Sequence, residues 1–179
     1  MRDSGPMAAP ELSFRSGEPG DADWLLGLFD GAIAWLVARG QPGQWGSEPF
    51  SSREPARAHV AELCASGELR VCSLDGEDVA AVALGAHPAH VQPIDRPELY
   101  INLLLVSRAH ARRGIGEGLV DRARAEARRR GAEVLRVDCW AGAPALVAWY
   151  ETRGFIRSSV FTVDLDRGAW TGQVFELTP

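Results

Sequence analysis

The sequence predicts an α/β domain, and three observations support this. Residues 99–106 are almost entirely apolar, which is typical of a strand covered on both faces. After Gly114 the pattern changes, and apolar residues recur at helical spacing as far as Ala127, with arginines and glutamates between them. Gly131 ends that helix, and the apolar run at 132–139 then predicts a second strand, parallel to the first through a right-handed helical crossover.

The elements before this unit follow from local patterns. Residues 11–16 alternate enough for a first strand. Asp21 is the expected N-cap of a helix whose apolar stripe runs to Leu36. A loop rich in Gly and Pro leads to a second helix near residues 53–65. Two strands at 68–74 and 79–85 then form a hairpin around Asp75-Gly76.

The elements after this unit complete the sheet. Residues 86–97 form a loop before the central strand, and residues 144–153 form a helix after the second parallel strand. The chain ends in a hairpin of strands at 155–163 and 169–177. The predicted order is therefore β-α-α-β-β-β-α-β-α-β-β, with one parallel pair in a mostly antiparallel sheet.

Length and composition indicate one domain. The chain has 179 residues, 46% of them hydrophobic, which is enough for a substantial core. We expect residues 1–10 to form a flexible tail and residues 11–179 to form the domain. The sequence shows neither a membrane-spanning run nor the apolar stretch of a signal peptide, so we expect a cytoplasmic protein. Its three cysteines lack CxxC spacing, which favours reduced, buried thiols and no metal site.

Charge is unevenly distributed. Residues 107–137 hold nine arginines and four acidic residues, a net charge of +5, whereas the whole chain carries −5. The remainder is therefore at −10, a balance that suits a cationic partner such as an amine, or simply aids solubility. Nucleic acid is a poor candidate for a partner with this balance.

The glycine-rich turn after the central strand predicts an anion site. Helix starts have free backbone N–H groups, and here we expect those of residues 112–118 to face a pyrophosphate. Gly114, Gly116 and Gly118 place no side chain in the way, and neighbouring arginines add positive charge. The turn lacks the Lys-Ser/Thr of a P-loop and the glycine spacing of dinucleotide folds. An ordinary glycine-containing turn is the alternative.

Two segments resemble motifs of the GNAT superfamily of N-acetyltransferases. The run Val106-Ser-Arg-Ala-His-Ala-Arg-Arg-Gly-Ile-Gly-Glu-Gly-Leu119 resembles its acyl-CoA motif, although Arg108 replaces the usual Pro and Ala111 replaces Arg or Gln. Residues 137–155 resemble the next segment through Tyr150, Gly154 and Phe155, whereas Ala143 replaces the usual Asn.

The resemblance implies a GNAT fold, with six to seven strands, about four helices and a central parallel pair that splays apart. It also implies binding of acetyl-CoA along the splayed strand and the glycine-rich turn. The residues implied for the cofactor are Leu104, Leu105, Val106, Ala111, Arg112, Arg113, Gly114, Ile115, Gly116, Glu117, Gly118, Ala143 and Tyr150.

The chemistry implied is acetyl transfer to a primary amine of a small molecule or peptide, by direct attack in a ternary complex. Tyr150 is the expected acid at the thioester sulfur, with a packing role as the alternative. Glu98 is the expected base, with His87 and His90 as other candidates. Other functions remain open: a non-catalytic acyl-CoA-binding module, another acyl group, or a hydroxyl acceptor.

The acceptor side is less defined. Trp45 could line the substrate wall or anchor its loop to the core, and Asn102 could position an amine or pair within the sheet. The same resemblance allows a monomer or a homodimer, and the sequence names no specific acceptor.

Overall fold

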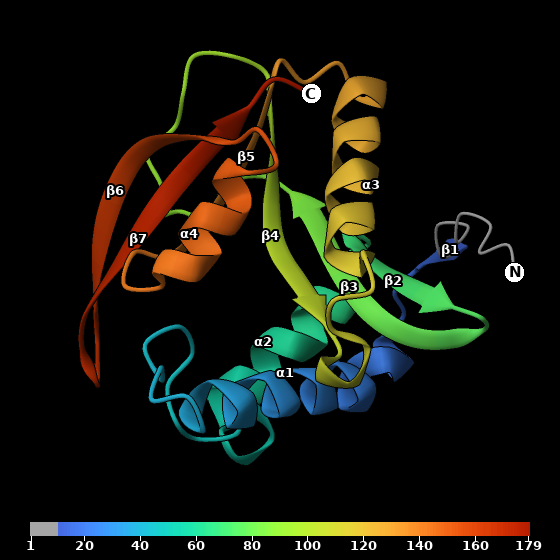
Figure 1. Ribbon diagram of the computed structural model, residues 1–179, viewed down its shortest axis with the longest axis vertical. Coiled ribbons are helices and arrows are strands. Elements are labelled where there is room, and N and C mark those ends of the chain that lie inside the picture. The colour runs from blue at the N-terminus through green and yellow to red at the C-terminus, as the bar shows by residue number, and fades with distance from the viewer. Residues whose placement is uncertain (1–10) are drawn as a thin grey trace, which may run out of the picture.

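A seven-stranded sheet in the order β1-β2-β3-β4-β5-β7-β6 organises the chain in the computed structural model, which describes residues 11–179 (Figure 1). The predicted flexible tail at 1–10 lies outside the described residues. Only β4 and β5 pair in parallel; every other neighbouring pair is antiparallel. The strands are β1 (Leu12–Ser16), β2 (Leu69–Leu74), β3 (Glu77–Gly85), β4 (Glu98–Val106), β5 (Val134–Trp140), β6 (Ile156–Leu165) and β7 (Gly168–Leu177).

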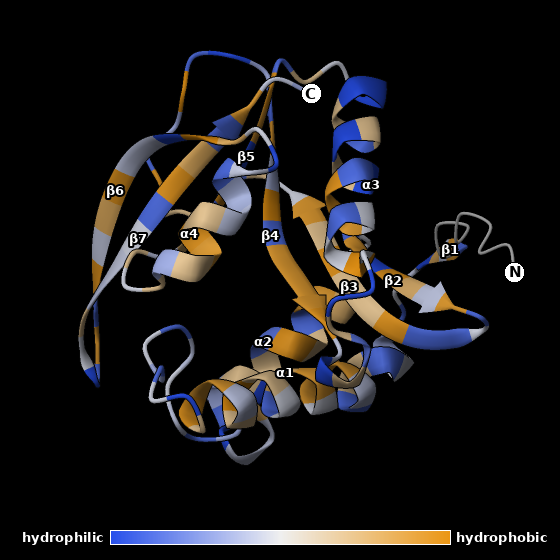
Figure 2. Cartoon of the chain, viewed as in Figure 1, coloured by the Kyte–Doolittle hydropathy of each residue, from blue (hydrophilic) through white to orange (hydrophobic). Residues whose placement is uncertain are grey.

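Four α-helices cover the two faces of this sheet. They are α1 (Ala22–Val37), α2 (Glu54–Ala65), α3 (Ile115–Arg129) and α4 (Pro144–Glu151). Leu119 of α3 and Val147 of α4 share one core cluster, and Phe29 of α1 and Val60 of α2 share a second cluster. Hydropathy alternates around α3, whose buried stripe faces the sheet (Figure 2). The predicted mixed α/β fold, with one parallel pair in a mostly antiparallel sheet, is confirmed.

Asp21 occupies the N-cap position of α1, as predicted, but its side chain does not cap the helix. A short 3₁₀ turn, Pro19–Asp21, precedes α1, and Asp21 already has helical backbone angles, φ −81° and ψ −5°. A capping residue needs an extended backbone to reach back to the helix amides. The carboxylate of Asp21 instead accepts hydrogen bonds from Nη2 of Arg15 at 2.7 Å and from the backbone N–H of Glu18 at 2.8 Å. The hydrogen bond from Arg15 is the main reason that the pKa of Asp21 is lowered.

Two sequence expectations concern the described residues as a whole. Cys64, Cys72 and Cys139 are all buried and unpaired with one another, as expected for structural thiols. In the part of the chain that the structure describes, no helix combines the length and apolarity needed to cross a membrane.

Candidate active site

The sheet opens between its two parallel strands. Pairing of β4 with β5 runs from Glu98–Val134 to Ile101–Val137 and stops there, although β4 continues to Val106 (Figure 1). Beyond that point each strand pairs only on its outer side, β4 with β3 and β5 with β7. The backbone of β4 around Leu104 therefore has an edge that can pair with an extended ligand.

A tight turn joins this strand to α3. A 3₁₀ turn at Arg108–His110 follows β4, and both Arg112 (φ +65°) and Gly114 (φ +76°) adopt left-handed backbone angles. Gly114 is the N-cap of α3, and no side chain caps the helix there. The amides of residues 112–117 take part in no backbone turn or cap hydrogen bond within residues 11–179. They form the open helix start that the sequence predicted.

Gly118 differs from that prediction. Its N–H donates to the carbonyl of Gly114 at 3.1 Å, so it belongs to the helix and is not a free donor. A Cβ at Gly118 would lie 2.3 Å from Cδ1 of Leu12, which shows that this glycine lets α3 pack against β1. A Cβ at Gly116 would lie 3.0 Å from the ring of Trp149, whereas a Cβ at Gly114 would meet no neighbour within 4 Å. Of these three glycines of the turn, only Gly114 therefore borders open space.

Arginines surround the start of α3. Arg112 and Arg113 are both exposed, and neither forms an ion pair within the described chain. The guanidinium of Arg108 lies 3.7 Å from the ring centroid of Trp35 in α1. Burial, together with the charges of Arg39 and Arg112, lowers the pKa of Arg108. The turn therefore carries positive charge that an anion would offset.

Tyr150 of α4 lies in the core beneath the opening. Its ring packs edge-on against Trp149 and Phe155, at centroid distances of 5.1 and 5.5 Å. Its hydroxyl makes no hydrogen bond within residues 11–179, and burial raises the pKa of Tyr150 far above its ordinary value. The hydroxyl is thus protonated and available as a donor. Ala143 is the N-cap of α4, and it offers no side-chain cap.

A carboxylate on β5 was missed by sequence reasoning. Asp138 follows Val137, the last residue that pairs with β4, and its Oδ1 accepts a 2.6 Å hydrogen bond from the hydroxyl of buried Tyr100. Removal from water raises the pKa of Asp138, while the hydrogen bond from Tyr100 and the charge of His90 lower it. A lone acid within the apolar run 134–140 was the available signal.

Glu98 lies at the closed end of the strand pair. Its Oε2 accepts a 2.9 Å hydrogen bond from Nη1 of Arg136, a residue only 1% exposed, and its Oε1 lies 2.7 Å from Nδ1 of His87. Because Glu98 is opposite Val134, it lies in the paired part of β4. Its carboxylate therefore holds two basic groups in place, away from the opening.

The two predicted acceptor-side residues both have structural partners. Asn102 is the extra residue of a bulge in β4, and its Nδ2 donates to the carbonyl of Ala86 at 2.9 Å. Trp45 packs edge-on against Phe29, at 5.3 Å between ring centroids, so it anchors its loop to α1.

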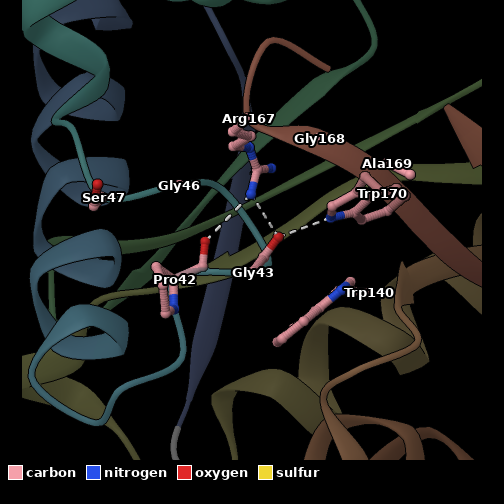
Figure 3. A pocket seen from close by; sticks show the side chains of 9 residues that line it. All are labelled: Pro42, Gly43, Gly46, Ser47, Trp140, Arg167, Gly168, Ala169 and Trp170. Carbon is pink, nitrogen blue, oxygen red and sulfur yellow. Dashed lines mark hydrogen bonds between the residues drawn. The ribbon is translucent and has the colours of Figure 1, made fainter. Parts of the chain in front are cut away.

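A cavity of about 330 Å³ lies between the loop after α1 and the β6–β7 hairpin (Figure 3). Nη1 of Arg167 donates to the carbonyl of Gly43 at 2.9 Å, and Nε1 of Trp170 donates to the same carbonyl at 2.8 Å. The backbone N–H of Trp140 donates to Oε1 of Gln44 at 2.9 Å. The lining residues are Pro42, Gly43, Gly46, Ser47, Trp140, Arg167, Gly168, Ala169 and Trp170.

This arrangement fits an acyl-CoA. The unpaired edge of β4 suits the amides of an extended pantetheine arm, and the open amides before α3, with Arg112 and Arg113 beside them, suit a pyrophosphate. Within residues 11–179, no three His, Cys, Asp or Glu side chains cluster in a way that could hold a metal ion.

Comparison with known proteins agrees with this geometry. The acetyltransferase (GNAT) family profile matches residues 32–155, more than half of the chain. The chain belongs to the GNAT acetyltransferase family. Membership of this family implies an acyltransferase. No curated protein matches the chain.

Solved GNAT structures share the fold at low sequence identity. A GCN5-related N-acetyltransferase from Rhodopseudomonas palustris is 20% identical with a TM-score of 0.70, covering 99% of this chain and 100% of that one. The structure of yncA from Salmonella typhimurium, with its cofactor acetyl-CoA, is 18% identical with a TM-score of 0.62, and 93% of each chain is covered. A ribosomal-protein-alanine N-acetyltransferase from Brucella melitensis is 18% identical with a TM-score of 0.65, covering 93% and 99%.

Proposed function

We propose that this GNAT protein transfers the acetyl group of acetyl-CoA to a primary amine of a small molecule or peptide. One observation carries the proposal: the parallel strands separate after Ile101–Val137, directly beside a helix start with open amides. An extended thioester cofactor needs both features together, one for its arm and the other for its pyrophosphate.

The residues that hold the cofactor follow from this geometry. We assign the arm to the backbone of Leu104, Leu105 and Val106, and the pyrophosphate to the amides of residues 112–117. Acetyl-CoA, when bound, supplies an activated acetyl group. A backbone N–H of β4 in the opening would stabilise the oxyanion that develops at its carbonyl.

We assign the base to Asp138 in preference to Glu98. An amine with an ordinary pKa of about 10 must lose a proton before it attacks. Asp138 lies just beyond the last β4–β5 pair, on the sheet face opposite Cys139 and the α3–α4 core, and its raised pKa suits proton transfer. Glu98 already engages Arg136 and His87 in the paired segment.

Tyr150 is the proposed acid for the departing thiolate. Its hydroxyl is protonated over the whole physiological range, because burial raises its pKa. It has no competing hydrogen-bond partner within the described residues. A hydroxyl positioned at the leaving sulfur would stabilise the developing thiolate by donating a hydrogen bond to it, and a proton transferred to the sulfur would disfavour re-attack on the product.

The test is release of free thiol from acetyl-CoA in the presence of a panel of amines, with cofactor binding measured separately. Turnover with at least one amine supports an N-acetyltransferase. Tight acetyl-CoA binding without turnover on any amine or alcohol would instead identify a non-catalytic acyl-CoA-binding module. Ala111 and Ala143, which replace polar residues usual in the motifs, favour this alternative. Transfer to alcohols alone would identify an O-acyltransferase.

A further inference from the structure

The cavity in Figure 3 is positively charged, although the chain outside residues 107–137 carries a net negative charge. Arg167 is the only charged side chain among its lining residues. The acidic residues nearest in sequence, Glu48 and Asp166, neither line the cavity nor form an ion pair with Arg167. The net charge of the whole chain therefore does not indicate the charge at this cavity.

Arg167 keeps hydrogen-bonding capacity after closing the loop. Its Nη1 donates to the carbonyls of Pro42 and Gly43, and its Nη2 donates to the carbonyl of Gln44 at 3.3 Å. A guanidinium has five N–H groups, so Nε and Nη2 each retain one without a partner among residues 11–179. These two nitrogens form one edge of the guanidinium, and such an edge binds a carboxylate through two parallel hydrogen bonds.

A second guanidinium strengthens the positive potential. Arg53 lies over the ring of Phe50 at 4.5 Å, and its buried Nε has no hydrogen-bond partner within the described chain. Burial and the charge of Arg53 both lower the pKa of Arg167. No carboxylate of the described residues forms an ion pair with either arginine, so an anionic ligand would relieve their repulsion.

The position of the cavity links it to the reacting centre. Trp140 lines the cavity and lies two residues after Asp138, so both side chains project from the same face of β5. Two residues of a strand span about 7 Å. One small molecule can therefore place an amine near Asp138 and another group beside the indole rings and Arg167.

We propose that this cavity binds the carboxylate of the acyl acceptor, so that the substrates are amines that also carry a carboxylate, as amino acids do. The inference rests on the proposed function, because it takes Asp138 to mark the position of the reacting amine. Trp140 and Trp170 contact the part of the acceptor between its amine and its carboxylate, while Arg167 binds the carboxylate itself.

The test measures acceptor binding without turnover. Protein saturated with CoA, which carries no acetyl group, is titrated by calorimetry with L-alanine, L-methionine and L-phenylalanine, and with the carboxamide of each. At a pH of about 6 both members of a pair carry an ammonium group and the same side chain, so the carboxylate is the difference between them. We expect at least one acid to bind ten-fold or more tightly than its amide.

Two variants separate charge from loop closure. Arg167→Gln removes the guanidinium, and we expect the acid-to-amide ratio to fall close to one. Trp170→Phe removes the other hydrogen bond to Gly43 but no charge, so any loosening of the loop should weaken acid and amide alike and leave the ratio intact. Arg167→Lys, which keeps the charge, should retain part of the preference.

The outcomes are distinct. A ratio close to one for every pair in the native protein, or an unchanged ratio in Arg167→Gln, overturns the inference. If the acids bind preferentially but no amine supports thiol release, the carboxylate site stands and the proposed transferase function fails. If amines support thiol release but the acids bind no more tightly than their amides, the function stands and the carboxylate site fails.

Discussion

Asp138 is the proposed base, a role that requires a carboxylate able to take up a proton. Asp138→Asn keeps the shape and can still accept the hydrogen bond from Tyr100, but it cannot take a proton. We expect kcat to fall about 100-fold, a usual contribution of a general base, with acetyl-CoA affinity unchanged. Steady-state thiol release and calorimetry measure the two quantities. Asp164→Asn, at an exposed position of β6, is the matched control. Equal activity of the two variants would contradict the assignment of Asp138.

We expect Tyr100 to influence the pH range over which the proposed base Asp138 acts. Its hydrogen bond lowers the pKa of Asp138, so Tyr100→Phe should raise that pKa. A base must be deprotonated, and activity is lost as the pH falls through its pKa. The acidic limb of the kcat/KM profile should therefore move to higher pH in the variant, while activity at high pH stays close to that of the native protein. A limb that stays in place would show that Asp138 is not the group that titrates.

Tyr150→Phe tests the acid. The ring contacts with Trp149 and Phe155 remain, so the fold should hold, and only the hydroxyl is lost. We expect a 10- to 100-fold decrease in kcat with little change in acetyl-CoA affinity. Full turnover in the variant would limit Tyr150 to packing.

Residues differ in how far the sequence reveals them. Tyr150 could be identified from the sequence motif. The pKa of its hydroxyl depends mainly on the burial of Tyr150 itself. Asp138 was missed because its properties depend on Tyr100, which is distant in the chain and adjacent only once β4 and β5 pair. Arg167 was missed because its role requires a hairpin turn to meet the loop after α1.

The start of α3 is the helix end proposed to bind the pyrophosphate of the cofactor. Gly114 and Gly131 lie at opposite ends of α3, both with positive φ and with open space for a Cβ. Alanine at either position should cost roughly 1–2 kcal/mol of stability through backbone strain. Only Gly114→Ala should also weaken acetyl-CoA binding, by about ten-fold, because it alters the amides before the helix. Urea unfolding and calorimetry test this, and an equal affinity loss in Gly131→Ala would argue against the site.

The order and type of the helices and strands were predicted well from the periodicity of apolar residues in the sequence. The α3 stripe and the terminal hairpin are clear in the sequence because their patterns are local. The sequence was less informative where a partner comes from elsewhere in the chain: Arg15 on β1 binds the carboxylate of Asp21, which stands at the N-cap of α1 without capping it, and Leu12 explains why Gly118 is a glycine. Local patterns contain no information about such neighbours.

At the scale of the whole molecule, stability should depend on pH through Glu126. This buried carboxylate of α3 accepts hydrogen bonds from Arg129 and Arg130, which lower its pKa from 4.5 to about 2. A lowered pKa stabilises the fold above pH 4.5, and that stabilisation is lost as the pH falls toward 2. Glu126→Gln should therefore cost roughly 2 kcal/mol at pH 7 and much less near pH 2.

Urea unfolding at several pH values measures this difference. Glu133→Gln, at an exposed position just after the same helix, is the control and should change stability little at any pH. A constant difference between Glu126→Gln and the native protein across the pH range would show that the hydrogen bonds, and not the charge, matter.

In the proposed complex, acetyl-CoA lies between β4 and β5 with its pyrophosphate at the start of α3. Hydrogen exchange with and without acetyl-CoA tests it most directly. We predict slower exchange at the amides of residues 112–117 and at Leu104–Val106, with no change at the far end of α3 near Arg129. Absence of binding, or slower exchange confined to another part of the molecule, would rule out this position for the cofactor.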